Sequence, residues 1–329
     1  MALGLLPFLL ATMSPLTGSP AGPPAVARNE EVMIAAGGGR KLAGTLTLPS
    51  SGAPPFPAAI SLTGSGPHLR DGNRTPGHPY RPFREIAQAL AARGVAMLRL
   101  DDRGVGGSTG DSRAATGDDV ADDTHRAIAW LRGRADIDGA RVAVIGHSFG
   151  GAIAPLVAAQ DPEVAALVLM GAPALSFRET MRYQHGYAVE QDPDIKPGAR
   201  AAALKERMAR QERNVAASAE AWRRWLQDRD PLPTARKVRC PVLILQGLTD
   251  RAVSPEDAKV LERTMQTAGN RRVTLRLFKN LNHHFNLDPI GATDGYDRLP
   301  SQSLAPRFLD AISSWLASTL RGPVDPSER

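Results

Sequence analysis

The stretch VAVIGHSFGG at residues 142–151 decides the fold class of this chain. Its first four residues are apolar, as in a buried strand, and the small residues after Gly150 are typical of a helix start. The G-x-S-x-G pattern places Ser148 on a sharp strand-to-helix turn with a strained backbone. Glycines are expected there because side chains would collide where strand and helix approach each other. We predict a nucleophile elbow, with Ser148 as nucleophile and the N–H of Phe149 facing a developing oxyanion. The alternative is a glycine-rich connection with an ordinary serine.

Segments typical of strands and helices alternate along the rest of the chain. Strands are expected at residues 31–36, 42–48, 58–62, 95–100, 141–145, 164–170, 242–245 and 273–278, and helices at 84–92, 118–131, 151–159, 255–267 and 304–320. The first two strands should form an antiparallel pair through the glycines at 37–39. The alternation predicts an α/β fold, with a mostly parallel eight-stranded sheet that has helices on both faces.

Residues 172–238 interrupt this alternation between the sixth and seventh strands. They contain no strand candidate and are rich in Arg, Ala, Glu and Gln, with Met, Trp and Tyr interspersed. We expect two to four helices, with a loop around residues 191–193. Ligands of such folds bind at the carboxyl edge of the sheet. The insertion, about residues 175–237, is therefore predicted to be a helical lid; the alternative is that it only adds packing.

A serine hydroxyl needs a general base, and the base needs an acid that orients it. In doubly wound hydrolases the order along the chain is Ser, acid, His. Asp250 follows the strand at 242–245 and is the candidate acid. Glu256 and Asp257 compete with it, but they lie at a helix start, where acidic residues are common for electrostatic reasons.

Two neighbouring histidines are the candidate base. His283 and His284 are the only histidines after Asp250, so a triad in this order must use one of them. His147 is not expected to serve, because it neighbours the nucleophile and its side chain should point elsewhere. The other histidines precede the acid: His68, His78, His125 and His185.

The loop TGSGP at residues 63–67 follows the third strand, where a second oxyanion donor is expected. Its glycines leave backbone N–H groups open to a ligand. We assign the N–H of Ser65 to this role, beside that of Phe149. The alternative is a plain turn.

Composition excludes several classes of function. The 329 residues are 42% hydrophobic and 22% charged, with a net charge of +6, and basic residues are scattered among acidic ones. This pattern does not favour nucleic-acid binding. Cys240 is the single cysteine, which rules out an internal disulfide and a cysteine-based metal site, and we expect a buried, apolar environment for it. No cofactor and no metal ion are predicted.

Residues 1–27 carry no charged side chain and contain an A-x-A pattern at residues 25–27. They lack the basic start of a signal peptide, so both a signal peptide and a disordered tail stay open. The first interpretation implies a secreted or periplasmic protein, and the second a cytoplasmic one. The apolar stretch is too short for a membrane span. The hydrolase domain is expected at residues 28–329.

With these motifs the chain resembles the α/β-hydrolase superfamily, and within it bacterial esterases related to dienelactone hydrolases and acylaminoacyl-peptidase-type enzymes. The resemblance rests on LTGSGP at 62–67, LRLDDRGVGGS at 98–108, GHSFGG at 146–151, GLTD at 247–250 with Val253, and LNHHF at 281–285. In that family the base is the histidine of an N-H-x-F pattern, which implies His283. The D-R-G turn, here at residues 102–104, is mainly structural there.

Two positions depart from that family. Thr63 stands where many relatives have histidine, and Leu69 stands where relatives often have a polar residue before Arg70 and Asp71. Neither departure removes a member of the triad, but both leave the details of the substrate open. The sequence predicts a serine hydrolase that cleaves small-molecule carboxylic esters through an acyl-enzyme. A peptidase of aminopeptidase or acyl-peptidase type, a thioesterase, an acyltransferase and a non-catalytic binding protein remain alternatives, and the oligomeric state is open.

Overall fold

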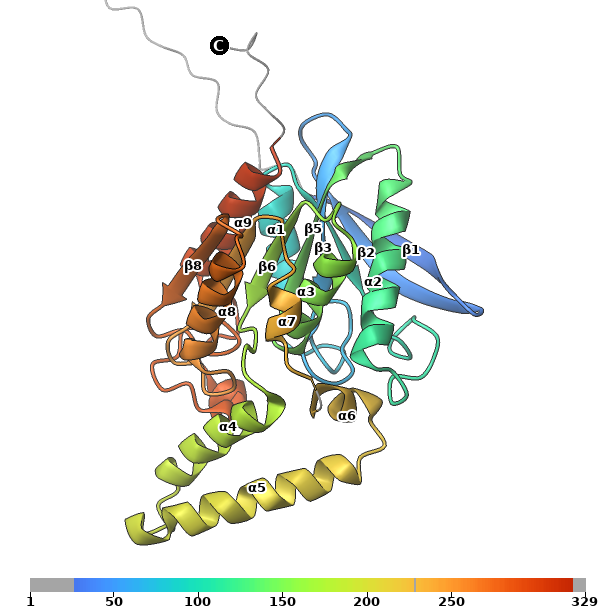
Figure 1. The fold of residues 1–329 in the computed structure, drawn as a ribbon. Helices are drawn as coiled ribbons and strands as arrows, with labels where there is room; N and C mark the ends of the chain where they lie inside the picture. The colour runs from blue at the N-terminus through green and yellow to red at the C-terminus, as the bar shows by residue number, and fades with distance from the viewer. Residues whose placement is uncertain (1–26, 228, 322–329) are drawn as a thin grey trace, which may run out of the picture.

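Eight strands form a single sheet: β1 (Arg28–Gly37), β2 (Arg40–Leu48), β3 (Phe56–Leu62), β4 (Ala96–Leu100), β5 (Ile137–His147), β6 (Ala166–Met170), β7 (Val242–Gly247) and β8 (Val273–Phe278). They belong to residues 27–227 and 229–321, which the computed structural model describes (Figure 1). The order is β1-β2-β4-β3-β5-β6-β7-β8. β2 is antiparallel to β1 and β4, and all other neighbours are parallel. This is the α/β sheet that the sequence predicts, including its antiparallel leading pair.

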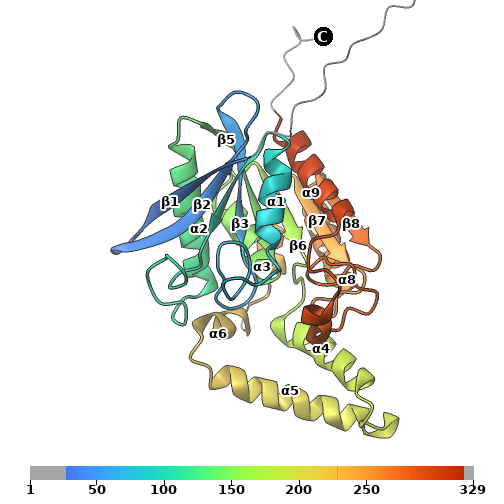
Figure 2. The same ribbon diagram turned by 180° about the vertical axis from the view of Figure 1, so that it is seen from behind.

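Helices cover both faces of the sheet. One face carries α1 (Pro82–Ala91) and α9 (Pro306–Thr319), and the other carries α2 (Gly117–Arg132), α3 (Phe149–Gln160) and α8 (Pro255–Thr267). Figure 1 shows the second group in front of the strands. Figure 2 shows the opposite side of the molecule, where α1 and α9 lie in front. The architecture is that of an α/β-hydrolase.

The apolar run of β5 is explained by burial on both faces. Val142 and Val144 belong to the core beneath α2 and α3, whereas Ala143 and Ile145 belong to the core beneath α1 and α9. Side chains alternate between the two faces of a strand, so a central parallel strand between two helix layers is apolar throughout. This packing fixes the end of β5, from which Ser148 follows.

The insertion between β6 and β7 is helical, as expected. It contains α4 (Phe177–Gln191), a 3-10 turn at Pro197–Ala199, α5 (Arg200–Ala216), α6 (Ala221–Gln227) and α7 (Leu232–Ala235). α7 packs against α3 and α8. α4, α5 and α6 lie below the carboxyl edge of the sheet, and α5 is farthest from the strands in both ribbon views.

The predicted leader at residues 1–27 lies, except for Ala27, outside the described residues. In the two described ranges, every helix is too short or too polar to cross a bilayer. Cys240 is a free, half-buried thiol, and burial raises its pKa to about 11.

Candidate active site

Ser148 occupies a strained position at the end of β5. Its φ is +53°, in a region that residues with a side chain rarely adopt. Close approach explains the flanking glycines. A Cβ on Gly146 would collide with the carbonyl of Gly150, and one on Gly150 would lie 2.5 Å from the carbonyl oxygens of Leu62 and Thr63. The structure thus has the elbow geometry that the G-x-S-x-G pattern predicts.

Asp250 and His283 are joined by a hydrogen bond of 2.8 Å from imidazole Nδ1 to carboxylate Oδ2. Asp250 is fully buried, and His283 is 7% exposed. The second carboxylate oxygen accepts the N–H groups of Ala252 and Val253, both at 2.8 Å. Gln246 donates to Oδ2 at 2.9 Å. The carboxylate is thus held in place on both oxygens, and its orientation fixes the imidazole.

The two competing acids have other partners. Asp257 is 1% exposed and accepts the N–H groups of Ala174 and Leu175, at 2.8 and 3.2 Å. Burial raises its pKa to about 6. Glu256 pairs with Lys259 at 2.6 Å at the start of α8. Asp257 therefore anchors the segment leading into the insertion.

His284 points to a different environment from His283. Its ring stacks on Tyr80 at 4.2 Å between centroids and lies 4.5 Å from the ring of Tyr296. Burial, followed by the charge of the neighbouring His283, holds its pKa well below the usual range. Of the two candidate histidines, the structure brings His283 to Asp250.

The expectation that His147 points away from the site is wrong. Its Nε2 donates to the carbonyl of His283 at 3.0 Å, and the two rings are 4.8 Å apart. Burial lowers its pKa to about 3, so the ring is neutral at physiological pH. The side chain turns along the wall of the site because the elbow leaves it between the oxyanion loop and the loop after β8. It supports His283 through the backbone.

The oxyanion loop at residues 63–67 lies beside Ser148. A Cβ on Gly64 would lie 3.6 Å from the Cβ of Ser148. The N–H of Gly150 donates to the carbonyl of Thr63 at 2.9 Å. Within the described ranges, the N–H groups of Ser65 and Phe149 donate no hydrogen bond. Both predicted donors are thus available to a ligand.

Asp102 fastens both ends of this loop. Both carboxylate oxygens accept the hydroxyl of Thr63, at 2.9 Å, and one also accepts the N–H of His68 at 2.8 Å. Burial raises the pKa of Asp102 to about 7, although these hydrogen bonds oppose the rise. Thr63, at the position that departs from the family, therefore has a structural partner in the D-R-G turn.

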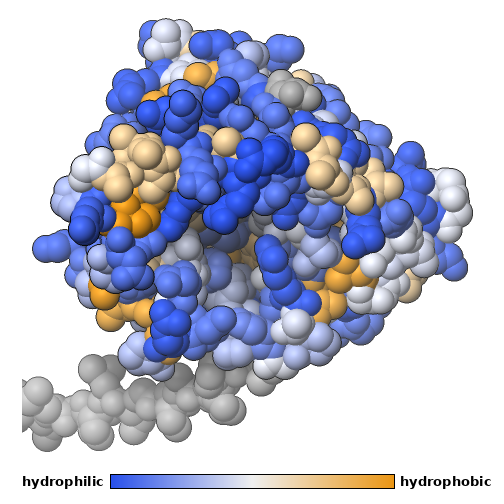
Figure 3. Space-filling view, turned by 90° about the horizontal axis from the view of Figure 1, so that it is seen from below, coloured by the Kyte–Doolittle hydropathy of each residue, from blue (hydrophilic) through white to orange (hydrophobic). Residues whose placement is uncertain are grey.

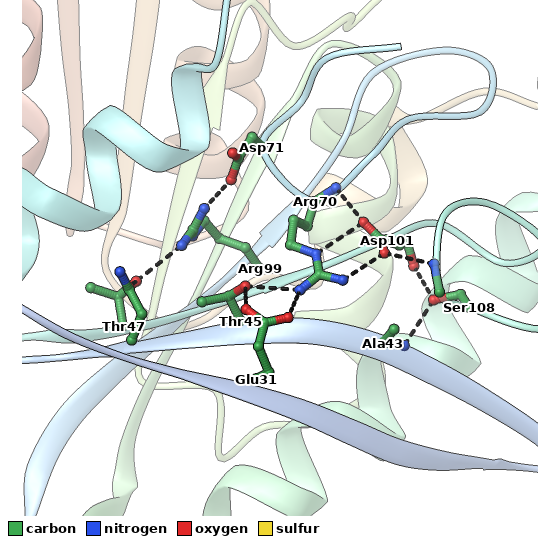
Figure 4. Close-up of polar contacts among 11 residues, drawn as sticks. Glu31, Ala43, Thr45, Thr47, Arg70, Asp71, Arg99, Asp101 and Ser108 are labelled. Atoms are coloured by element: carbon green, nitrogen blue, oxygen red, sulfur yellow. Dashed lines mark hydrogen bonds and ion pairs between the residues drawn. The ribbon is translucent and has the colours of Figure 1, made fainter. Parts of the chain in front are cut away.

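Arg70 and Asp71 hold the segment after the oxyanion loop in place through ion pairs (Figure 4). Arg70 donates to both oxygens of Asp101, at 3.1 and 2.8 Å, and also pairs with Glu31. Asp71 pairs with the buried Arg99. Burial would raise the pKa of Asp101, but the hydrogen bonds from Arg70 outweigh it and lower the pKa. The oxyanion loop therefore continues into a segment tied to β1 and β4.

A cavity of about 690 Å³ opens at Ser148. Its walls come from the oxyanion loop, the segment after it, the loop after β8 and the insertion. Most of the side chains that line it are polar, and they include Asn73, Gln184, Gln211 and six histidines. Figure 3 shows the hollow from below, largely bordered by hydrophilic residues. Ser148 and His283 both line it. The described residues contain no group of three or more His, Cys, Asp or Glu side chains suited to a metal ion.

The insertion is tied to the loop that carries the acid. Tyr183 of α4 donates its hydroxyl to the carbonyl of Asp250 at 2.7 Å, and Gln184 donates to the carbonyl of Ala252 at 2.7 Å. At its other end, the N–H of Ala221 donates to the carbonyl of Arg113 at 2.7 Å. Trp225 Nε1 donates to Asp118 of α2 at 2.7 Å.

Gly171, just after β6, is a site residue that the sequence analysis did not single out. Its φ is +54°, and an added Cβ would lie 3.1 Å from Nδ1 of His283 and 3.4 Å from Oδ2 of Asp250. Gln246 was missed as well, although its position at the end of β7, between an apolar run and Asp250, is a signal that could have found it.

Replacing Gly171 with alanine is expected to lower kcat about tenfold, because His283 must shift by a few tenths of an ångström. The measurement is ester hydrolysis at saturating substrate. Gly94→Ala is the matched control, since Gly94 also has a positive φ, +78°, but an added Cβ would meet no atom within 4 Å. Equal kcat losses in the two variants would mean that backbone strain alone, and not contact with His283, is responsible.

Known proteins are similar to this chain in sequence. The chain is 27% identical over 283 residues to Esterase EstD of Thermotoga maritima, covering 84% of this chain and 65% of that protein. It is 27% identical over 297 residues to dipeptidyl aminopeptidase BIII of Pseudoxanthomonas mexicana, covering 86% of this chain and 38% of that protein. The chain thus spans less than two thirds of the length of these curated relatives.

Solved structures show the same fold at low sequence identity. An esterase from Pyrococcus furiosus superposes with a TM-score of 0.60 at 16% identity, over 90% of this chain and 92% of that one. The family model described as serine aminopeptidase, S33, matches residues 77–290, which include Ser148, Asp250 and His283. The match extends over more than half of the chain. This chain belongs to the serine aminopeptidase S33 family, within the α/β-hydrolases.

Proposed function

We propose that the protein hydrolyses carboxylic esters, with Ser148 as nucleophile, His283 as general base and acid, and Asp250 as the orienting acid. The observation that carries the proposal is the placement of a strained serine in one cavity with a histidine whose Nδ1 is bonded to a buried carboxylate. The similarity to a relative named as an esterase supports the choice of substrate class.

In the first step His283 takes the proton from Ser148 Oγ, which attacks the acyl carbon of the ester. The carbonyl oxygen becomes negative, and the N–H groups of Phe149 and Ser65 stabilise it. His283 then donates the proton to the leaving alcohol, which leaves an acyl-enzyme. Water, activated by the same imidazole, releases the acid and restores Ser148. Asp250 keeps Nδ1–H in place and stabilises the imidazolium.

Ser148 Oγ has no hydrogen bond to any residue of the described ranges, so it is free to face the cavity. Proton transfer requires Oγ and Nε2 of His283 to come within hydrogen-bond distance. In serine hydrolases this contact often tightens only when substrate is bound.

Ester cleavage is favoured over cleavage of peptides with a free amine. Among the described residues that line the cavity, the carboxylates are Glu220 and Asp297. Glu220 pairs with Arg223, and Asp297 lies 3.5 Å from His78. A substrate ammonium would have to compete with these partners. The insertion, about residues 175–237, is proposed to cover the cavity and to contact the substrate.

The test combines labelling with a choice of substrates. A fluorophosphonate probe is expected to label Ser148, and p-nitrophenyl acetate is expected to be hydrolysed far faster than an aminoacyl p-nitroanilide. Faster anilide cleavage would establish the peptidase instead. An absence of labelling in folded protein would leave a binding protein on a hydrolase fold. Thioester and acceptor-alcohol assays separate the thioesterase and the acyltransferase.

A further inference from the structure

A second, smaller cavity lies on the other side of the oxyanion loop. Its volume is about 80 Å³. Apolar side chains make up most of its wall, among them Ile60, Leu62, Leu100, Val120, Phe149 and Trp222. Phe149 directly follows the nucleophile, so this apolar space begins next to the reacting centre.

The carboxylates in the wall of this cavity already have partners. Asp101 is bonded to Arg70, and Asp123 accepts from Arg103 at 2.9 Å through each oxygen. Asp102 accepts from the oxyanion loop. These carboxylates are therefore engaged within the protein. Ser61 Oγ, which also lines the cavity, is buried without a hydrogen-bond partner among the described residues, and most of the remaining surface is apolar and suited to hydrocarbon.

Trp222 of α6 stands between the two cavities. It lines both of them, together with Gly64, Gly66 and Pro67 of the oxyanion loop segment. The indole is 8% exposed and packs on the ring of Phe149, with 5.5 Å between centroids. It is the side chain from the insertion that closes the apolar cavity towards the larger one.

The proposed reaction indicates which part of the ester faces each cavity. His283 must protonate the leaving alcohol, so the alcohol lies on the His283 side, in the large polar cavity. The acyl group then extends to the opposite side, past Phe149 and the oxyanion loop. That direction leads to Trp222 and the apolar cavity behind it.

We propose that the apolar cavity is an acyl-chain subsite and that Trp222 limits the chain length it admits. Short acyl chains end at the indole of Trp222. Longer acyl chains enter the apolar cavity behind it only when the indole moves. This inference rests on the proposed ester hydrolysis and adds a specificity-determining residue from the insertion to it.

The experiment measures kcat/KM for p-nitrophenyl acetate, butyrate, hexanoate and octanoate. In the wild type we expect a preference for acetate and butyrate. In Trp222→Ala the two cavities become continuous, and each further buried methylene should raise kcat/KM about fourfold. The octanoate-to-acetate ratio of kcat/KM should rise at least about tenfold. Trp222→Phe keeps an aromatic ring and should stay close to the wild type.

Trp225→Ala is the matched control from the same helix. Trp225 also contacts Phe149, at 5.9 Å, but lines neither of the two cavities. It should leave the octanoate-to-acetate ratio unchanged. A shift of similar size in Trp225→Ala, or an unchanged ratio in folded Trp222→Ala, overturns the proposal. If the wild type hydrolyses none of the esters and Ser148 is not labelled, the proposed function itself has failed.

Discussion

Replacing Ser148 with alanine is expected to lower kcat for p-nitrophenyl acetate by about 10⁶-fold, the size of effect seen when a serine hydrolase loses its nucleophile. The variant has no atom that can attack the acyl carbon. The oxyanion donors are backbone groups and remain, so a small rate above that of water is expected to persist. Steady-state hydrolysis at saturating ester is the measurement.

The fold of Ser148→Ala serves as its own control. Alanine keeps the Cβ and the φ of +53°, so the temperature of unfolding should match the wild type. Glycine at this position would relieve the strain and is expected to raise the free energy of unfolding by about 1 kcal/mol. If folded Ser148→Ala retained more than a tenth of the wild-type kcat, another residue would have to be the nucleophile.

Replacing His283 with asparagine is the second large effect, expected at about 10⁴- to 10⁶-fold in kcat. Asparagine can still bond to Asp250 but cannot accept the proton of Ser148. His284→Asn is the matched variant, since it alters the adjacent residue in the same loop. It removes the stacking on Tyr80 and should cost less than about tenfold in kcat.

The pair of variants distinguishes the two histidines directly. Both are measured with the same ester, and their folded fractions are compared by circular dichroism. The reverse order of activities would assign the base to His284. Comparable large losses in both would mean that the loop after β8, and not one imidazole, limits the rate.

Much of the fold could be predicted because local signals agree with tertiary packing. The helix at 255–267 begins as expected, where Ser254 accepts the N–H of Glu256 and Pro255 occupies the first turn. The strand at 273–278 also has its expected bounds. β5 begins earlier than expected, at Ile137, because pairing with Phe56 of β3 extends it beyond its apolar run.

The candidate site was harder to predict where the side chains of adjacent residues point in different directions. Whether His283 or His284 meets Asp250 depends on a tight turn, in which Asn282 Oδ1 accepts the N–H groups of His284 and Asn286, and Phe285 has a φ of +57°. Local propensity does not encode this choice, and only the resemblance favoured His283. The side chain of His147 was misplaced for the same reason, since its direction is set by contacts with the distant loop after β8.

The attachments of the insertion have a consequence for substrate traffic. α4 is tied to the backbone beside Asp250, α6 is tied to α2, and α5 spans the distance between them (Figures 1 and 2). A segment fixed at both ends is an arch rather than a flap hinged at one end. A flap can stop turnover until it swings open, whereas molecules can pass beneath an arch that only flexes. We expect ester and product to enter and leave through the openings on either side of α5. The rate of exchange should then depend on the width of these openings, and no opening movement of the insertion should be required.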